Sequence, residues 1–521
     1  MGGIFGMYRI GIDVGGTNTD ACILDKDLNV VNSVKMPTTD DVESGIYNSL
    51  KKVLEESKID SSLIKYVMLG TTHCTNAIVE RKRLNNVAMI RIAKPATVAI
   101  NPFIDWPEDL RQKVELDSII VSGGYEFDGR IISELCKDEV VEFCKKVKGK
   151  AESVAISGVF SPVNNEQEKQ VAKWVREVLG EDIPISLSNE IGNVGILERE
   201  NAAILNSALS KVGKDVSLGL KKSLHQLNID AQIYFSQNDG TLMNLEYTVK
   251  YPIFTIGCGV TNSIRGASFL SKVKNAVVLD VGGTTSDLGI LQNGFPRESA
   301  IAVEVGGVHT NFRMPDIISI GLAGGTCVKG DINSFKIGPE SVGYKITEES
   351  LVFGGNTLTL SDVATKLGRA FGDKINNVSD LDIKYCELIQ EKVKTTLEDL
   401  IDQMKTNQDD VDLVLTGGGS IIVPEKLQGV KNIIIPPHYN AANAIGAALG
   451  QVSGDVEKVY SLDKISREDA INEVKEEAIK KAQMAGAKLD SISVLFIEDV
   501  PLAYLPGNAI RIKIKVVGDL V

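Results

Sequence analysis

A stretch of twelve residues that occurs twice constrains the fold of this chain more than any other feature. Residues 13–24 read DVGGTNTDACIL and residues 280–291 read DVGGTTSDLGIL, so eight of the twelve positions are identical. Each copy follows a short apolar run and leads into further apolar residues, which predicts a strand, a tight Gly-Gly turn and a second strand. The duplication predicts that the chain contains two related halves.

The tip of such a hairpin offers groups that bind phosphate. Glycines let a ligand approach the backbone, and successive N–H groups form a nest for an anion. A carboxylate at the same tip can hold a hydrated Mg²⁺ ion that binds phosphate oxygens. A single copy would be interpreted as a glycine-rich turn, but a turn needs only the glycines, and both copies also keep two aspartates and a threonine. We therefore expect two lobes that grip a nucleoside triphosphate.

Other nucleotide-binding motifs and partner classes are disfavoured. The chain contains no GxxxxGK(S/T) motif, and no GxGxxG motif opens a helix with an acidic residue at the expected distance. The net charge of −13 argues against a nucleic-acid or anionic-membrane partner. Seven scattered cysteines without a CxxC pair indicate a reducing compartment. With no signal sequence and no apolar run of eighteen residues, we expect a cytoplasmic protein.

The length of 521 residues indicates two or three domains. We place them at residues 1–190, 191–455 and 456–521, the last being a small α/β element with a helix over 467–485. Polar or glycine-rich loops follow predicted strands at Gly70, Ser236, Gly321 and Gly417, where α/β proteins place ligand-contacting residues. A helix of small residues over 440–450 suits a place where two lobes touch, although packing alone also explains it.

Taken in order, these pieces resemble the actin, Hsp70 and sugar-kinase superfamily of nucleotide-binding proteins. Residues 13–20 resemble its first phosphate loop, 280–287 its second and 416–420 its adenosine loop. Within the superfamily the chain is most similar to the hydantoinase A/5-oxoprolinase family, through residues 13–25, 70–82, 198–202, 279–291 and 315–326. The resemblance implies a two-lobed, ribonuclease H-like α/β fold with a nucleotide cleft between the lobes and a small C-terminal α/β element.

The resemblance also implies an activity, the ATP-dependent hydrolysis of a cyclic amide such as a hydantoin, oxoproline or a related lactam. It implies ATP and Mg²⁺ as cofactors, a second subunit of the hydantoinase B type and an oligomer. Two departures leave the substrate open: Ile318 stands where family members carry a histidine, and residues 257–260 read GCGV in place of an SGPA-type loop. The alternatives are a small-molecule kinase on the same fold and a nucleotide-switched interaction protein.

The two hairpins and the glycine-rich loops supply the expected nucleotide site. We expect Asp13 and Asp280 to hold Mg²⁺. The predicted phosphate ligands are the backbone N–H groups of the hairpin glycines and the neighbouring hydroxyls: Gly15, Gly16, Gly282, Gly283, Thr17, Thr19, Thr284 and Thr285. The adenosine would lie against Gly417, Gly418 and Gly419.

A carboxylate near the γ-phosphate must activate water, and Asp20, Asp287 and Asp316 are the candidates. Asp20 and Asp287 are explained at least as well as braces of their own turns. The predicted substrate contacts lie in the remaining polar loops: Thr71, Thr72, His73, Asn76, Asn238, Gly324 and Gly325. Thr75 and Asn76 also fit helix N-caps.

Other nucleophiles and ligands have weaker support in the sequence. A lone loop histidine such as His73 or His309 is more often structural than functional. Cys258 has no visible histidine partner that would activate its thiol, which disfavours a thiol nucleophile.

Overall fold

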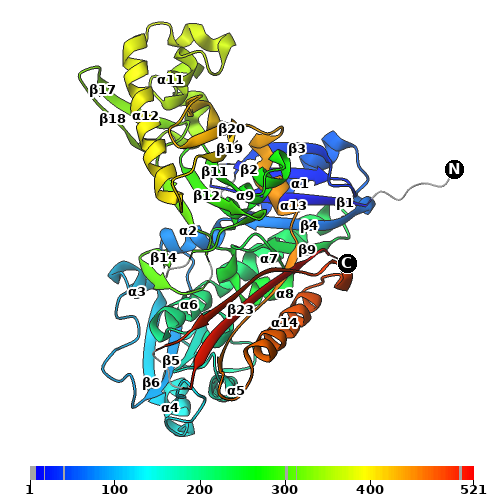
Figure 1. Ribbon diagram of the computed structural model, residues 1–521, viewed down its shortest axis with the longest axis vertical. Coiled ribbons are helices and arrows are strands. Elements are labelled where there is room, and N and C mark those ends of the chain that lie inside the picture. The colour runs from blue at the N-terminus through cyan, green and yellow to red at the C-terminus, as the bar shows by residue number, and fades with distance from the viewer. Residues whose placement is uncertain are drawn as a thin grey trace, which may run out of the picture.

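The computed structural model describes residues 7–16, 18–38, 42–299, 303–312, 314–503 and 507–520. Thr17, a predicted phosphate ligand, lies outside these ranges. The molecule is elongated, with α11, α12 and the β17–β18 hairpin at one end and β5–β7 at the other (Figure 1). Between these ends lie the two sheets that carry the repeated hairpins.

The first repeat forms two strands, β1 and β2, near one edge of a nine-stranded sheet with the order β22-β23-β21-β10-β9-β4-β1-β2-β3. β1 (Tyr8–Val14) is antiparallel to β2 (Asn18–Leu24) and parallel to β4 (Ile64–Thr71). β3 (Val30–Pro37) is antiparallel to β2, and β9 (Gln232–Ser236) is parallel to β4.

The second repeat builds the same arrangement. β11 (Ala276–Val281) is antiparallel to β12 (Ser286–Gln292) and parallel to β19 (Val411–Thr416). β13 (Phe295–Pro296) and β20 (Val430–Ile434) complete the order β13-β12-β11-β19-β20, which repeats β3-β2-β1-β4-β9 in order and direction, and β16 (Ile317–Ile320) also pairs with β12. This duplication confirms the predicted two-lobed α/β fold.

A separate four-stranded parallel sheet lies at the lower end in Figure 1. Its order is β6-β5-β7-β8, built from β5 (Val87–Lys94), β6 (Glu115–Ser122), β7 (Ser153–Gly158) and β8 (Ile185–Leu187). The helices α3 (Glu108–Val114), α4 (Lys137–Val147) and α5 (Glu166–Leu179) belong to this part of the chain.

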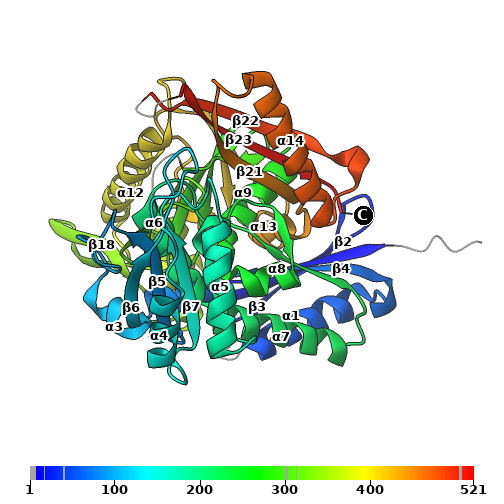
Figure 2. The ribbon, with the colours of Figure 1, turned by 90° about the horizontal axis from the view of Figure 1, so that it is seen from below.

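The C-terminal segment extends the first sheet. β21 (Val452–Ser461) joins it through β10 (Leu242–Asn244), and β23 (Ala509–Gly518) and β22 (Ser493–Pro501) follow. Eight of the ten residues of β23 are buried, and α14 (Arg467–Met484) packs on β21 and β23 (Figure 2). The nine-stranded sheet therefore takes strands from all three predicted ranges, and the division at 190 and 455 stays a prediction.

A buried ion-pair cluster ties this C-terminal segment to two residues from the middle of the chain, Asp239 and Glu298. Lys515 on β23 is only 1% exposed, and its Nζ lies 2.7 Å from Asp239 Oδ2 and 2.9 Å from Glu298 Oε1. Lys513 Nζ lies 2.9 Å from Glu298 Oε2. Buried charges are tolerated when they are paired in this way.

The remaining elements cover the sheets or form small hairpins. The helices are α1 (Val42–Ser57), α2 (His73–Val79), α6 (Ile196–Ala208), α7 (Ser210–Gln226), α8 (Leu245–Lys250), α9 (Cys258–Ser271), α10 (Ile346–Glu349), α11 (Leu360–Lys366), α12 (Ile383–Met404) and α13 (Ala442–Ala448). The hairpins are β14 (Val303–Val305) with β15 (Val308–Thr310), and β17 (Thr326–Asp331) with β18 (Ser334–Ser341). α9 packs on strands of both large sheets, and α13 packs on α9 and on β1, β2 and β4.

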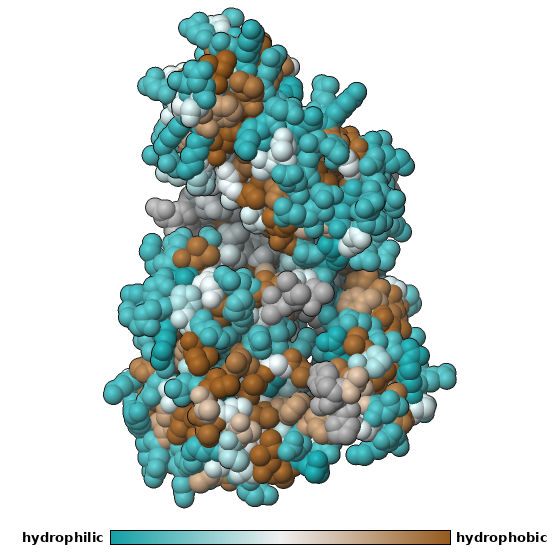
Figure 3. Space-filling model, turned by 60° about the vertical axis from the view of Figure 1, so that its left-hand side comes forward, coloured by the Kyte–Doolittle hydropathy of each residue, from teal (hydrophilic) through white to brown (hydrophobic). Residues whose placement is uncertain are grey.

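On the face shown in Figure 3, most residues are polar and apolar residues are interspersed among them. Within the described ranges, no helix has the length and apolar character needed to cross a membrane.

Candidate functional site

The first hairpin places two carboxylates on one face of its sheet. Asp13 at the end of β1 pairs in register with Asp20 on β2, and directly paired residues point to the same face. Asp13 is 4% exposed, and its two oxygens accept hydrogen bonds from two amides: Asn262 Nδ2 on α9 at 3.2 Å and Asn443 Nδ2 on α13 at 3.5 Å. Asp20 Oδ2 lies 2.7 Å from Lys35 Nζ on β3.

The second hairpin repeats the pair with different neighbours. Asp280 pairs in register with Asp287, and Asp287 accepts a hydrogen bond from Ser319 Oγ on β16. Burial raises the pKa of Asp280, and the nearby polar side chains of Ser263 on α9, Thr416 on β19 and Asn443 counteract this increase.

The two hairpins meet at one site, because Asn443 Nδ2 lies 3.5 Å from Asp13 Oδ2 and the Asn443 side chain also acts on Asp280, whose pKa it lowers. Burial raises the pKa of Asp13 to about 6, and the charges of Asp20 and Asp280 add to the increase. Burial also raises the pKa of Asp287 to about 6, with a contribution from Asp280, and raises the pKa of Asp280 itself. Four carboxylates from two distant parts of the sequence therefore interact electrostatically.

This cluster fits a cation. The buried Asp20 Oδ1 has no hydrogen-bond partner among the described residues, and clustered carboxylates with raised pKa values are stabilised by a positive charge. Across the same ranges, no three His, Cys, Asp or Glu side chains form a metal site by themselves. Asp13 and Asp280 can hold a divalent ion whose other ligands are water and phosphate oxygens, which is how Mg²⁺ is usually bound.

At the hairpin tips, two of the backbone N–H groups predicted to bind phosphate already form hydrogen bonds within the turns. Gly15 N–H donates to Asn18 O at 3.0 Å and Gly282 N–H to Thr285 O at 2.9 Å, so these two amides close their own turns. Gly16, Thr284 and Thr285 are exposed at the tips, and Gly283 is partly exposed.

Thr19 does not belong to the phosphate-binding face. It precedes Asp20 on β2, and successive side chains of a strand point to opposite faces. Its side chain is fully buried, and its hydroxyl lies 3.3 Å from that of Thr38.

Two glycine-rich loops pack directly on the second hairpin. At Gly417 the backbone has a φ of +79°, and an added Cβ would lie 2.3 Å from Val281 O. At Gly419 an added Cβ would lie 2.3 Å from Gly282 O, whereas Gly418 has no atom within 4 Å of that position. The backbone therefore closes against the hairpin at Gly417 and Gly419 and stays open at Gly418, where a flat ring can approach.

Gly324 and Gly325, predicted to contact substrate, lie against this hairpin as well. Gly324 N–H donates to Gly282 O at 3.2 Å and Gly325 N–H to Gly283 O at 2.9 Å. They support the second phosphate loop, and their place beside Gly419 puts them next to the expected adenosine loop.

Asp316 is not brought to the cluster. It directly precedes β16, whose opposite end pairs with Ser286 beside the hairpin tip. Its carboxylate accepts a hydrogen bond from Arg297 Nε at 2.9 Å. Of the three candidate bases, the structure therefore places only Asp20 and Asp287 beside Asp13 and Asp280.

The loop after β4 lies next to the first hairpin. Thr72 Oγ1 donates to Val14 O at 3.1 Å, and Asn76 Nδ2 lies 3.4 Å from Thr72 Oγ1. The Thr71 hydroxyl contacts His73 Nδ1, and burial lowers the pKa of His73 to about 4, so its imidazole is neutral at pH 7. Because α2 begins at His73, Thr75 and Asn76 lie inside the helix and do not cap it.

The other singled-out residues have structural surroundings. Asn238 is 2% exposed, and its Nδ2 lies 3.4 Å from Met314 Sδ. The Cys258 thiol is buried against the backbone of Thr71, and burial raises its pKa, which disfavours a thiolate nucleophile. His309 is exposed on β15.

Sequence reasoning missed the groups that surround the carboxylates, namely Lys35, Asn262, Ser263, Ser319, Thr416 and Asn443. Apart from Thr416, the first residue of the predicted adenosine loop, none of them stands in a recognisable motif. One weak signal was present: Asn443 is the only polar side chain in the Ala442–Ala448 helix, where burial would otherwise favour an apolar residue.

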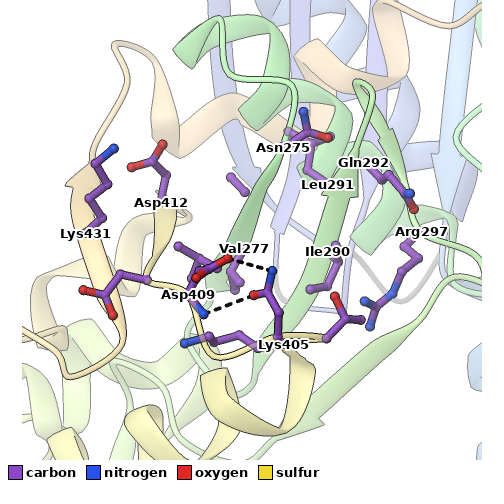
Figure 4. Close-up of a pocket in the computed structure, with 15 residues that line it drawn as sticks. Asn275, Val277, Ile290, Leu291, Gln292, Arg297, Lys405, Asp409, Asp412 and Lys431 are labelled. Atoms are coloured by element: carbon purple, nitrogen blue, oxygen red, sulfur yellow. Dashed lines mark hydrogen bonds between the residues drawn. The ribbon is translucent and has the colours of Figure 1, made fainter.

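Two cavities lie away from the hairpin tips. One of about 430 Å³ lies at the opposite end of the second sheet, between the start of β11, the end of β12 and residues 405–412 (Figure 4). The other, of about 510 Å³, lies between residues 292–299 and strands β22 and β23. Neither is lined by a residue predicted to bind nucleotide or substrate.

Relatives by sequence match most of the chain. An uncharacterised protein of Methanocaldococcus jannaschii is 23% identical over 98% of this chain and 82% of its own length. The acetophenone carboxylase gamma subunit of Aromatoleum aromaticum is 25% identical over 69% of this chain and 53% of its own length. The caprolactamase alpha subunit of Pseudomonas jessenii is 22% identical over 69% of this chain and 54% of its own length. The chain thus spans about half the length of the two relatives with a named activity.

Solved structures and family models agree with the fold. ATP-dependent caprolactamase from Pseudomonas jessenii matches with a TM-score of 0.78 at 17% identity, over 98% of this chain and 88% of that chain. Nucleotide-free acetone carboxylase matches with a TM-score of 0.69 at 17% identity, over 99% and 88%. Residues 9–179 match the model of the hydantoinase/oxoprolinase N-terminal region, and residues 199–371 match the hydantoinase/oxoprolinase model. These two matches cover more than half of the sequence, and the chain belongs to the hydantoinase/oxoprolinase family.

Proposed function

We propose that this protein uses ATP and Mg²⁺ to open the ring of a cyclic amide, such as a hydantoin, oxoproline or a related lactam. The observation that carries the proposal is the convergence of two equivalent hairpins, whose aspartates Asp13 and Asp280 interact electrostatically and both interact with the side chain of Asn443. Relatives named caprolactamase subunit alpha and 5-oxoprolinase 1 support the choice of substrate class.

The nucleotide would lie between the hairpin tips. Asp13 and Asp280 would hold Mg²⁺, which neutralises charge on the phosphates when it is bound. The N–H groups of Gly16 and Gly283 and the exposed hydroxyls of Thr284 and Thr285 would bind phosphate oxygens. The adenosine would lie over Gly418, where the backbone is open.

An amide carbonyl is a weak electrophile, and phosphorylation of its oxygen activates the ring carbon. The carbonyl oxygen takes the γ-phosphoryl group and ADP leaves. Water adds to the ring carbon, the C–N bond breaks and the nitrogen takes a proton, which leaves a linear acyl phosphate. A second water hydrolyses it, so that cyclic amide, ATP and two waters give a linear amino acid, ADP and phosphate.

Asp287 is the best-placed general base for the attacking water. Its pKa is raised to about 6, and a base is most effective when its pKa lies near the working pH. Asp287 forms no ion pair with any of the described residues, whereas Asp20 is paired with Lys35. We therefore assign proton transfer to Asp287 and charge balance to Asp20.

Carboxylation is a second candidate, because relatives include subunits of acetophenone and acetone carboxylases. A kinase on this fold would release a stable phosphorylated product, and a nucleotide-switched interaction protein would turn over ATP slowly and without response to cyclic amides. The relatives are named as subunits, and we propose that a second chain, of the hydantoinase B type, takes part here too.

One experiment separates these functions. ADP release is measured with hydantoins, oxoproline, lactams, ketones with bicarbonate, and sugars, with and without a hydantoinase B-type subunit, and product masses are determined. The proposal predicts ADP and phosphate in equal amounts with a linear acid from a cyclic amide. Bicarbonate-dependent gain of a carboxyl group, or a phosphorylated sugar, would contradict it.

A further inference from the structure

We infer that Asn443 is a positioning residue that holds the carboxylates of the two hairpins in the arrangement that binds a divalent cation. This inference rests on the proposed function only in assigning the cation to Asp13 and Asp280. It concerns a side chain that no sequence motif marks.

Asn443 is the only residue of α13 with a polar side chain. The residues around it on α13 are alanine, isoleucine and glycine and are buried, whereas Asn443 is half-buried. Its amide nitrogen carries two hydrogens, and an ionised carboxylate only accepts hydrogen bonds. Nδ2 lies 3.5 Å from Asp13 Oδ2, and the side chain also acts on Asp280, whose pKa it lowers. The side chain of Asn443 thus interacts with a carboxylate from each hairpin.

The other amide and hydroxyl donors at the cluster each act on one of the two aspartates, Asp13 or Asp280. Asn262 Nδ2 donates to Asp13 Oδ1 at 3.2 Å. The hydroxyls of Ser263 and Thr416, 2.8 Å apart, act on Asp280 and lower its pKa. Of these described amide and hydroxyl side chains, only Asn443 acts on both Asp13 and Asp280.

The backbone around Asn443 fixes its position. A Cβ added at Gly446 would lie 1.8 Å from Asn262 O, and one at Gly266 would lie 2.0 Å from Ala442 O. The helices α9 and α13 therefore touch backbone to backbone beside their two asparagines. A Cβ at Gly11 would lie 2.1 Å from Ala444 O, so α13 is also pressed against β1 just before Asp13. The backbone that carries Asn443 is therefore held against the backbone that carries Asp13.

Groups that hydrogen-bond metal ligands orient them, and their removal typically lowers metal affinity or activity about tenfold to hundredfold. The test uses Asn443→Ala, Asn443→Asp and the control Asn432→Ala. Asn432 is matched because its Nδ2 donates to Asp412 Oδ1 at 2.7 Å on an exposed edge of the second sheet. Mn²⁺ binding is followed by electron paramagnetic resonance with and without a non-hydrolysable ATP analogue, and folding is checked by circular dichroism.

With the analogue present, Asn443→Ala is expected to weaken Mn²⁺ binding about tenfold or more, with metal-free nucleotide affinity little changed. Asn443→Asp adds a third carboxylate and is expected to strengthen Mn²⁺ binding in the absence of nucleotide. Asn432→Ala should match the wild type in both states. Unchanged Mn²⁺ affinity in both folded Asn443 variants would overturn the inference. A wild-type protein that binds Mn²⁺ and nucleotide but opens no cyclic amide would contradict the proposed function and leave these readouts intact.

Discussion

The two hairpins share a sequence but not an electrostatic environment. In the first, Asp20 is 7% exposed and paired with Lys35 from the neighbouring strand. In the second, the equivalent Asp287 is partly exposed and meets the hydroxyl of Ser319 from β16. The ammonium group of Lys35 thus pairs with the carboxylate of Asp20, whereas the carboxylate of Asp287 accepts a hydrogen bond from a neutral hydroxyl. The duplicated motif therefore contains the same two aspartates twice, and the adjacent strands place them in different surroundings.

The largest effect on activity is expected from substitution of Asp13 and Asp280, the equivalent aspartates that we assign to the metal. Asp13→Asn and Asp280→Asn should each reduce Mg²⁺-dependent nucleotide turnover about a hundredfold or more, because each removes a charged metal ligand. Isothermal titration calorimetry with Mg²⁺ and an ATP analogue measures the binding component. Asp402→Asn, at an exposed position of α12, is the control. A full loss in one variant and none in the other would show that the hairpins do not share one metal.

Asp13→Asn should also stabilise the ligand-free protein. The pKa of Asp13 is raised to about 6 in the folded state, above the value of about 3.9 of an unfolded chain. The folded state therefore binds its proton more tightly, and the free energy of unfolding falls as the pH rises from about 4 to about 6. At pH 7 the substitution should raise the free energy of unfolding by roughly 1–3 kcal/mol, measured by urea denaturation. A decrease of similar size in the free energy of unfolding would contradict the inference that burial destabilises the ionised carboxylate of Asp13.

The next effect separates the hairpins. Asp287→Asn should lower kcat by about 10²–10⁴-fold, because it removes the base, while nucleotide affinity is retained. Asp20→Asn should lower kcat by less than about tenfold, since it leaves that base in place. Steady-state kinetics with the cyclic amide found in the screen decides this. A larger loss of kcat in Asp20→Asn than in Asp287→Asn would instead assign the general base to Asp20, in the first hairpin.

A smaller effect is expected in the pH profile. The hydrogen bond from Ser319 lowers the pKa of Asp287, so its removal in Ser319→Ala should raise that pKa and shift the acidic limb of kcat to higher pH. Lys35→Met removes the ion-pair partner of Asp20. It should leave the acidic limb of the kcat profile unchanged, because that limb is assigned to Asp287. The affinity for Mg²⁺ should change, because Lys35 also acts on Asp280. A limb that moves only in Lys35→Met would contradict the assignment.

The smallest effect is expected at the tips. A Cβ at Gly16 meets no atom within 4 Å, and one at Gly283 meets only Gly343 O at 3.8 Å. Gly16→Ala and Gly283→Ala should therefore change the free energy of unfolding by no more than about 0.5 kcal/mol. Both should weaken ATP binding several-fold, measured by fluorescence titration. Unchanged affinity in both would show that phosphate does not approach these tips.

The repeated motif predicted the fold because local patterns determine a hairpin. Apolar runs on both sides of Gly-Gly predict two strands, and the second copy predicts the second lobe. Asp13 and Asp280 could be selected for the same reason. The helix over 467–485 and the strands that follow it were also predicted, but their pairing with the first sheet depends on β10, more than 200 residues earlier in the chain.

The rest of the site depends on contacts that the sequence does not encode locally. Asp316 lies only a few residues from Gly324, yet the direction of β16 carries it away from the tip. Thr19 adjoins Asp20, yet strand alternation turns it to the buried face. Asn262 and Asn443 reach Asp13 only because α9 and α13 cross with their backbones in contact.

The most direct test is a crystal structure with Mg²⁺ and a non-hydrolysable ATP analogue. The account predicts a triphosphate between Gly16 and Gly283, with the metal between Asp13 and Asp280 and the adenosine at Gly418. A nucleotide bound to one hairpin alone, or in the cavity of about 430 Å³ shown in Figure 4, would contradict the claim that the hairpins form one site.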